Sequence, residues 1–292
     1  MRGFTRVVVA LLALLAALAV TPAAQARKPA AGGVVLPSAP RAMWVWTRPD
    51  PKTLVDYARA RGVTDVFVSV PDHLPTSGAA LTWVTSLRNL AAPAGIRLQA
   101  LGGDVAWIDS PTTAVAWETE ALSTGLFTGA HVDLEPWMHS QWNTDQGGVL
   151  RRYLSTLSQL QNATTLPLEV DVSFWLWTLT TDAGTPVDSA VIALADRVTV
   201  MSYRNTATGT DSITDVGART LAKANAAGRP VRLAAETNDL GSDAVSLKQT
   251  FWGHTQSQMA GTLAAVDAAE AGVRNYAGIA VEDYAGWSAL AP

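Results

Sequence analysis

From Arg41 to the end of the chain, short β-rich hydrophobic runs alternate with longer segments of helical period. This alternation predicts repeated βα units and a parallel sheet. We count eight strand candidates: 41–46 (RAMWVW), 63–70 (VTDVFVSV), 97–104 (RLQALGGD), 129–136 (GAHVDLEP), 167–175 (PLEVDVSFW), 197–205 (RVTVMSYRN), 231–239 (VRLAAETND) and 276–284 (YAGIAVEDY).

The segments between the strands carry helix start and stop signals. Segments 50–62, 110–125 and 211–228 each begin with Asp or Ser as an N-cap and end with Gly, and in two of them Pro follows the cap. Strands that alternate with helices over about 250 residues, with no helix after the last strand, predict a single (β/α)8 TIM barrel over residues 41–292. A doubly wound open sheet is the competing architecture, but the Gly-rich turn that normally follows its first strand does not occur in residues 44–53.

The first residues of the chain carry an export pattern. Arg2 and Arg6 precede an apolar run over residues 7–20, and Ala24-Gln25-Ala26 forms a small-x-small cleavage site. We therefore predict a signal peptide over residues 1–26, a Pro/Ala/Gly-rich linker over residues 27–40, and a secreted, extracellular protein. An uncleaved membrane anchor is the weaker alternative, because the run is shorter than the roughly 20 residues that span a bilayer.

The amino-acid composition argues against several classes of function. The chain has 21 basic and 25 acidic residues, a net charge of −4, and loss of Arg2 and Arg6 with the signal peptide would make it more acidic. This balance argues against nucleic acids as partners. Because the chain has no cysteine, disulfides, a thiolate nucleophile and a sulfur-ligated metal are excluded. We predict no cofactor and no metal site, and the sequence does not indicate an oligomeric state.

The fourth strand candidate carries an unusual set of polar residues. Side chains alternate across a strand, so its apolar residues share one face and its polar residues share the other. In a barrel the apolar face packs on the helices, and the polar face looks inward, toward the mouth at the carboxyl ends of the strands. Burying charged groups is costly unless they are paired or serve chemistry. The strand therefore predicts three functional side chains at the mouth: His131, Asp133 and Glu135.

Other strand ends add to this mouth. Several carboxyl groups in one cleft cannot all ionise cheaply, so at least one should have a raised pKa and act as an acid near neutral pH. Indole faces suit the apolar faces of sugar rings. The further candidates at strand ends are Asp171, Met201, Tyr203, Arg204, Glu236 and Glu282, and the tryptophan candidates are Trp44, Trp46, Trp137, Trp175 and Trp287.

Four of these features resemble glycoside hydrolase family 18, the chitinases and their relatives. The matching positions are Gly102-Gly103 ending strand three, Asp133-Leu134-Glu135 on strand four, Met201-Ser202-Tyr203 on strand six, and Trp287 after strand eight. The resemblance implies that Glu135 is the general acid, that Asp133 orients an acetamido group of the substrate, and that Tyr203 hydrogen-bonds that group. The chain departs from the family pattern at three positions: Gly129 and His131 replace aspartates of the strand-four motif, and Arg204 stands where an aspartate commonly follows the tyrosine.

A second glycosidase layout competes with this one. Many retaining glycosidases place the acid in a Glu-Pro pair at the end of strand four and the nucleophile at the end of strand seven, which here would be Glu135-Pro136 and Glu236. Carboxyl groups about 5 Å apart would favour double displacement, and about 6.5–9.5 Å would favour inversion. We favour the first layout, because it rests on separate matches on several strands.

The sequence thus predicts a secreted glycoside hydrolase that cleaves a polysaccharide or cell-wall glycan, with Glu135 as general acid. One alternative is a non-catalytic, chitinase-like carbohydrate-binding protein. The other is a metal-dependent hydrolase using His131, Asp133 and Glu135, which is weakened by the roughly 6.6 Å between alternate residues of a strand. His73 and His139 lie in expected loops and are expected to be exposed to solvent.

Overall fold

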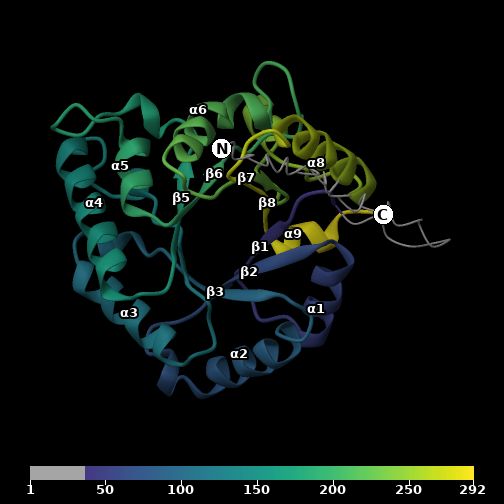
Figure 1. Cartoon of the computed structure of the whole chain (residues 1–292), viewed down its shortest axis with the longest axis horizontal. Helices are drawn as coiled ribbons and strands as arrows, with labels where there is room; N and C mark the ends of the chain where they lie inside the picture. The colour runs from purple at the N-terminus through teal and green to yellow at the C-terminus, as the bar shows by residue number, and fades with distance from the viewer. Residues whose placement is uncertain (1–36) are drawn as a thin grey trace, which may run out of the picture. The chain divides into compact units, whose positions relative to one another are not determined.

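The computed structural model describes residues 37–292, so the predicted signal peptide and most of the linker lie outside the described residues. Within this range, eight parallel strands form a closed barrel in sequence order (Figure 1). The predicted TIM barrel is therefore confirmed. The strands are β1 (Arg41–Val45), β2 (Val63–Ser69), β3 (Arg97–Gly102), β4 (Ala130–Val132), β5 (Leu168–Ser173), β6 (Arg197–Met201), β7 (Val231–Glu236) and β8 (Tyr276–Glu282).

Helices lie outside the ring of strands (Figure 1). Asp50 and Ser212 cap α1 and α6 through bonds from the backbone N–H groups of Thr53 and Asp215, whereas Ser110 makes no side-chain cap bond to α3. Among residues 37–292, no helix is both long and apolar enough to span a bilayer. The α-helices are α1 (Pro51–Ala60), α2 (Gly78–Ala91), α3 (Pro111–Ser123), α4 (Gln146–Ala163), α5 (Val187–Leu194), α6 (Ile213–Ala226), α7 (Ala244–Gln249), α8 (Gln256–Glu270) and α9 (Tyr284–Ala289).

Two elements differ from the sequence prediction. The final strand is followed by α9, whose first turn is capped by Asp283 accepting from the Gly286 N–H, and six residues are too few to show a helical period. The fourth strand ends at Val132, because its pairing with β3 and β5 stops there. The chain then enters a 3₁₀ turn, η3 (Pro136–Met138), so Asp133 and Glu135 lie beyond the strand. Similar turns follow β2, β3 and β5: η1 (Leu74–Thr76), η2 (Val105–Ile108) and η4 (Leu176–Thr178).

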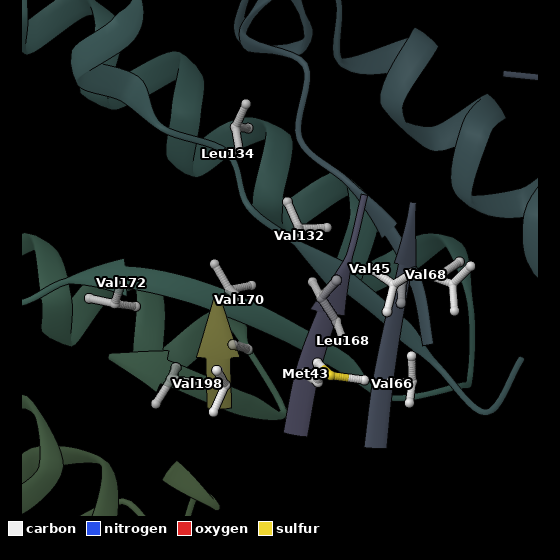
Figure 2. Close-up of a cluster of buried hydrophobic side chains, with 14 of the residues drawn as sticks. Met43, Val45, Val66, Val68, Val132, Leu134, Leu168, Val170, Val172 and Val198 are labelled. Atoms are coloured by element: carbon white, nitrogen blue, oxygen red, sulfur yellow. The ribbon is translucent and has the colours of Figure 1, made fainter. Parts of the chain in front are cut away.

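The main hydrophobic core lies between the strands and the helices. Figure 2 shows its β-branched and aliphatic side chains on neighbouring strands, among them Met43, Val66, Val132 and Val170. Full burial of such a side chain contributes about 1.5–3 kcal/mol. A second, smaller cluster fills the inside of the barrel: Ala42, Trp44, Phe67, Leu101, Ala234 and Ala280, with Tyr203 packed against it.

The floor of the barrel, toward the amino-terminal ends of the strands, is held by ion pairs. Arg232 on β7 donates from Nη2 to Asp65 on β2 (2.9 Å) and from Nε to Glu169 on β5 (3.0 Å). Gln99 and Thr199 also donate to Glu169. Burial alone would raise the pKa of Glu169, but the Arg232 guanidinium, His131 and the hydrogen bonds from Gln99 and Thr199 together outweigh burial and bring this pKa to about 2. The floor is a satisfied charge network that closes the barrel below the mouth.

Candidate active site

A cleft of about 600 Å³ opens at the carboxyl ends of β1 to β4. Barrel enzymes place their catalytic residues at this end of the strands. The cleft combines acidic groups with aromatic side chains and has no Lys or Arg in its wall. Its lining residues are Trp46, Ser69, Val70, Pro71, Asp72, Leu101, Gly102, Gly103, Asp104, Val105, Trp107, Trp117, Asp133, Glu135 and Met138.

Asp133 and Glu135 both line this cleft, as predicted from the pleat of the strand. Burial raises the pKa of Asp133 well above its usual range, and the negative charges of Asp171 and Glu135 add to the rise. Burial also raises the pKa of Glu135, although a contact with the Trp137 side chain opposes it. A carboxyl group in this setting can keep a proton at a higher pH than one in water, which a general acid requires.

Gly102, the last residue of β3, and Gly103 fix the backbone at Asp133. The Asp133 N–H donates to the Gly102 carbonyl (2.9 Å). A Cβ at Gly103 would overlap the Asp133 carbonyl oxygen, and a Cβ at Gly102 would stand 2.5 Å from the Trp107 ring and 2.6 Å from the Trp117 ring. Only glycine allows these approaches, so the pair positions Asp133 and the indole wall together.

Trp46 also lines the cleft and is 39% exposed. Its indole Nε1–H donates to Oε1 of Glu282 at the end of β8, whereas Oε2 of Glu282 is buried without a partner. Burial raises the pKa of Glu282 well above its usual range. The hydrogen bond fixes the ring at the cleft edge, where its face can pack against a sugar ring.

The candidates from β6 to β8 lie beside this cleft rather than in its lining. Glu236 and Glu282 are direct neighbours across β7 and β8. Oε1 of Glu236 accepts from the backbone N–H groups of Thr237 and Asn238 (both 2.6 Å) and from Asn238 Nδ2 (3.0 Å), yet burial raises the pKa of Glu236 to about 7. The pKa of the Tyr203 hydroxyl is raised by burial first, and the charges of Glu282, Asp133 and Glu236 contribute, so these groups lie near one another.

His131 and Asp171 lie deeper than predicted. The ring of His131 is 0% exposed, stacks on Phe67 at a centroid distance of 3.6 Å, and lies 2.8 Å through Nε2 from Oδ2 of Asp171. The pleat correctly predicted that His131 faces the inside of the barrel, but it did not predict how deeply the side chain lies. His131 is two residues before Asp133 and is therefore farther from the mouth. Neither residue lines the cleft, so their predicted direct contact with substrate is corrected to a buried pair beneath it.

Three further predicted binding residues lie away from the cleft. Trp44 is 1% exposed because it fills the barrel interior against Phe67. The buried Arg204 donates to Asp211 (2.7 Å) and to the Tyr203 carbonyl (2.7 Å), so it fastens the segment after β6. Trp287 packs against Tyr57 of α1, at 5.7 Å between ring centroids, because α9 carries it into the helical layer.

The remaining predicted residues are partly buried near the strand ends. Trp137 and Trp175 contact each other at a centroid distance of 5.1 Å, and Trp142 joins Trp175 at 6.3 Å. Met201 is the last residue of β6 and lies next to Ser173 of β5. These residues border the mouth but do not line the cleft.

Several lining residues were not predicted from the sequence. Asp72 and Asp104 follow the ends of β2 and β3, the same position relative to a strand that predicted Glu135 as a site residue. Trp107 and Trp117 carried no such signal, since an indole in a helical segment usually indicates core. His139 was expected to be exposed, but it is buried, with Nε2 3.0 Å from Oδ2 of Asp109. In residues 37–292 no group of three His, Asp or Glu side chains is arranged to hold a metal ion.

Comparison with solved structures places the barrel among known folds. The spore cortex-lytic enzyme SleL of Bacillus cereus matches with a TM-score of 0.52 and 12% identity, covering 87% of this chain and 73% of that chain. A chitinase of Chromobacterium violaceum matches at 0.53 and 14%, covering 86% and 97%, and a class V chitinase of Pseudomonas fluorescens at 0.54 and 14%, covering 87% and 98%. At these identities the likeness shows the fold alone, a (β/α)8 barrel similar to that of chitinases.

Comparison at the level of sequence gives no match: no protein-family model and no curated protein matches the chain.

Proposed function

We propose that this protein is a secreted glycoside hydrolase that cleaves a polysaccharide or cell-wall glycan, with Glu135 as the general acid. The observation that carries the proposal is that Asp133 and Glu135 lie in one cleft whose walls include three indoles, those of Trp46, Trp107 and Trp117. The export pattern in residues 1–26 supports secretion. The chitinase-like fold agrees with this chemistry, although a fold alone does not specify an activity.

The geometry supports a substrate-assisted reaction. In this route the acetamido oxygen of the substrate attacks the anomeric carbon, while Glu135 gives its proton to the leaving glycosidic oxygen. Asp133 and Tyr203 would hydrogen-bond the acetamido group, and the Tyr203 hydroxyl lies close enough to Asp133 to feel its charge. Protonation of the leaving oxygen contributes roughly 10²- to 10⁴-fold in rate.

Double displacement through Glu236 is the second mechanism. In this mechanism Glu236 attacks the anomeric carbon of a sugar whose glycosidic oxygen also contacts Glu135. Neither Glu236 nor Tyr203 lines the cleft, but one oxygen of Glu236 already accepts three hydrogen bonds. These hydrogen bonds favour the substrate-assisted layout, in which Glu236 is not the nucleophile.

The proposal is tested by hydrolysis of a glycan panel that includes chitin oligosaccharides and cell-wall glycans, with products read by mass spectrometry. We expect at least one substrate to be cleaved, and Glu135→Gln to reduce turnover about 10²- to 10⁴-fold. Glu270→Gln, in the last turn of α8 and outside the cleft lining, is the matched control and should retain turnover. Tight glycan binding without turnover would instead identify a carbohydrate-binding protein.

A further inference from the structure

Two loops carry much of the cleft lining, and a histidine joins them. The loop after β4 contains Glu135 and η3, and the loop after β3 contains Trp107 within η2. His139 follows η3 directly and is only 8% exposed. Its Nε2 lies 3.0 Å from Oδ2 of Asp109, which follows η2 directly. This contact is a side-chain link between the loop of the proposed acid and the loop of the Trp107 indole.

The backbone determines which ring nitrogen of His139 carries the proton. The Gln141 N–H donates to Nδ1 of His139 (3.1 Å), so Nδ1 is an acceptor. In a neutral imidazole the other nitrogen is then the donor. Nε2 therefore donates to Asp109, and this hydrogen bond is the first reason why the pKa of Asp109 lies below its usual range. A hydrogen bond to a carboxylate is stronger than one between neutral groups.

Helix α4 contacts the same carboxylate. Arg152 places Nε 2.9 Å from Oδ1 of Asp109 and donates from Nη2 to Oε1 of Gln141 (2.7 Å). One turn later, the buried hydroxyl of Thr156 donates to the Trp107 carbonyl (3.1 Å). Residues four apart lie on one face of a helix, so this face of α4 holds η2 at Trp107 and at the carboxylate that follows it. Asp109 is therefore a fixed acceptor for the histidine.

The segment that carries Glu135 lies beyond the strand pairing, because β4 ends at Val132. The Met138 N–H donates to the Glu135 carbonyl (3.1 Å), and the His139 N–H donates to the Pro136 carbonyl (3.2 Å). These two bonds lie within the turn and do not attach it to a neighbouring loop. They do connect its two ends, so a shift of His139 displaces Glu135 as well. The bond to Asp109 attaches the far end of the turn to η2.

We propose that His139 and Asp109 are positioning residues whose hydrogen bond holds η3 against η2 and thereby places the Glu135 carboxyl group in the cleft. Neither side chain lines the cleft, so neither is assigned a contact with substrate. A misplacement of a reacting group by about 1 Å can reduce a rate by about 10²-fold. The inference rests on the proposed function for its effect on turnover, since it takes Glu135 as the general acid. The effect on the loop itself needs no activity.

Two substitutions of His139 separate the bond between the loops from the turn itself. Glutamine places an amide N–H near the position of Nε2, so His139→Gln can still donate to Asp109. Asparagine is shorter, so His139→Asn can accept from the Gln141 N–H but does not reach Asp109. Asp109→Ala removes the acceptor. Asp182→Ala is the matched control, because its exposed carboxylate pairs with Arg151 of α4 (2.9 Å) and lies outside the cleft lining.

Steady-state kinetics on a cleaved oligosaccharide is the first measurement. His139→Asn and Asp109→Ala should each lower kcat about 10- to 100-fold and change KM less than about threefold, since Trp46 binds from another loop, after β1. The variant with both substitutions should lose no more than the larger single loss, because both remove the same bond. His139→Gln and Asp182→Ala should keep kcat within about threefold of the unmodified protein.

Hydrogen exchange in the free protein is the second measurement. The backbone N–H groups of Met138, His139 and Trp142 are hydrogen-bonded within this loop, and they should exchange faster in His139→Asn and Asp109→Ala but not in His139→Gln. Unchanged exchange in the folded variants would overturn the proposal, as would faster exchange with an unchanged kcat or equal losses of kcat in His139→Gln and His139→Asn. If the unmodified protein hydrolyses no glycan, the proposed function fails, and the exchange rates still decide whether this bond holds the loop.

Discussion

Gly103 and Asp133 approach so closely that a Cβ on Gly103 would overlap the carbonyl oxygen of Asp133. The neighbouring Gly102 carbonyl accepts the Asp133 N–H at 2.9 Å. These backbone contacts hold Asp133 after β4 has ended at Val132. The glycine pair therefore positions Asp133, which lies beyond the last residue of β4.

Gly103→Ala should displace the Asp133 backbone and reduce turnover, with a loss of stability of about 1–3 kcal/mol from overpacking. Turnover and urea unfolding measure the two effects. Gly261→Ala is the matched control, because a Cβ there meets nothing within 4 Å and the residue lies inside α8. It should stabilise the protein by roughly 0.5–1 kcal/mol and leave turnover unchanged. Equal behaviour of the two variants would contradict the positioning role.

Asp133→Asn and Glu236→Ala distinguish the two hydrolytic mechanisms. If the acetamido group is the nucleophile, Asp133→Asn should reduce kcat nearly as much as Glu135→Gln, and azide should not rescue Glu236→Ala. Steady-state kinetics with and without azide provide the measurement. Recovery of Glu236→Ala by azide, with Asp133→Asn still active, would show that Glu236 is the nucleophile.

Arg232→Met should destabilise the barrel by about 3–5 kcal/mol, because it leaves Glu169 buried without its cation and Asp65 with Arg97 as its remaining partner. The folded-state pKa of Glu169, about 2, lies below its ordinary value of 4.5, so the stability it contributes is present above pH 4.5 and is lost as the pH falls toward 2. Urea unfolding from pH 7 down to pH 3 should therefore show the difference from the unmodified protein shrinking. A difference that is constant with pH would refute this account of the floor.

Glu118→Met should stabilise the protein, and more so at alkaline pH. Glu118 on α3 is 0% exposed, neither of its oxygens has a hydrogen-bond partner, and burial raises its pKa to about 8. A carboxyl whose pKa is raised on folding costs no stability below pH 4.5, and the cost grows as the pH rises toward 8. Thermal unfolding at pH 5 and pH 8 measures the effect, and Glu120→Gln on the same helix should change it little. A gain that is no larger at pH 8 than at pH 5 would contradict the burial of an ionised group.

The strands and the acidic mouth could be predicted from sequence because both follow from alternation. Val132 and Leu134 belong to the hydrophobic core whereas Asp133 and Glu135 line the cleft, so the alternation continues past the end of β4 at Val132 and predicts both carboxyls at one cleft. The resemblance in Gly102-Gly103 also corresponds to a physical contact in the structure.

Alternation could not predict how deeply a side chain lies inside the barrel or which way the chain runs after a strand ends. Alternation assigns His131 to the inside but cannot tell that Phe67 and Trp44 cover it. Arg232 and Glu169 form an ion pair although they are 63 positions apart in the sequence, and no local sequence pattern indicates this pair. Trp287 does not lie at the mouth, because the chain enters α9 directly after β8.

A crystal structure of the Glu135→Gln variant, soaked with an oligosaccharide that the unmodified protein cleaves, tests whether Glu135 is the general acid. We expect a glycosidic oxygen within hydrogen-bond distance of the side chain at position 135. We also expect the acetamido group of the preceding sugar against Asp133 and a sugar ring on the indole of Trp46. A sugar chain bound with its glycosidic oxygens away from position 135, or bound outside the cleft, would contradict the assignment of Glu135 as the general acid.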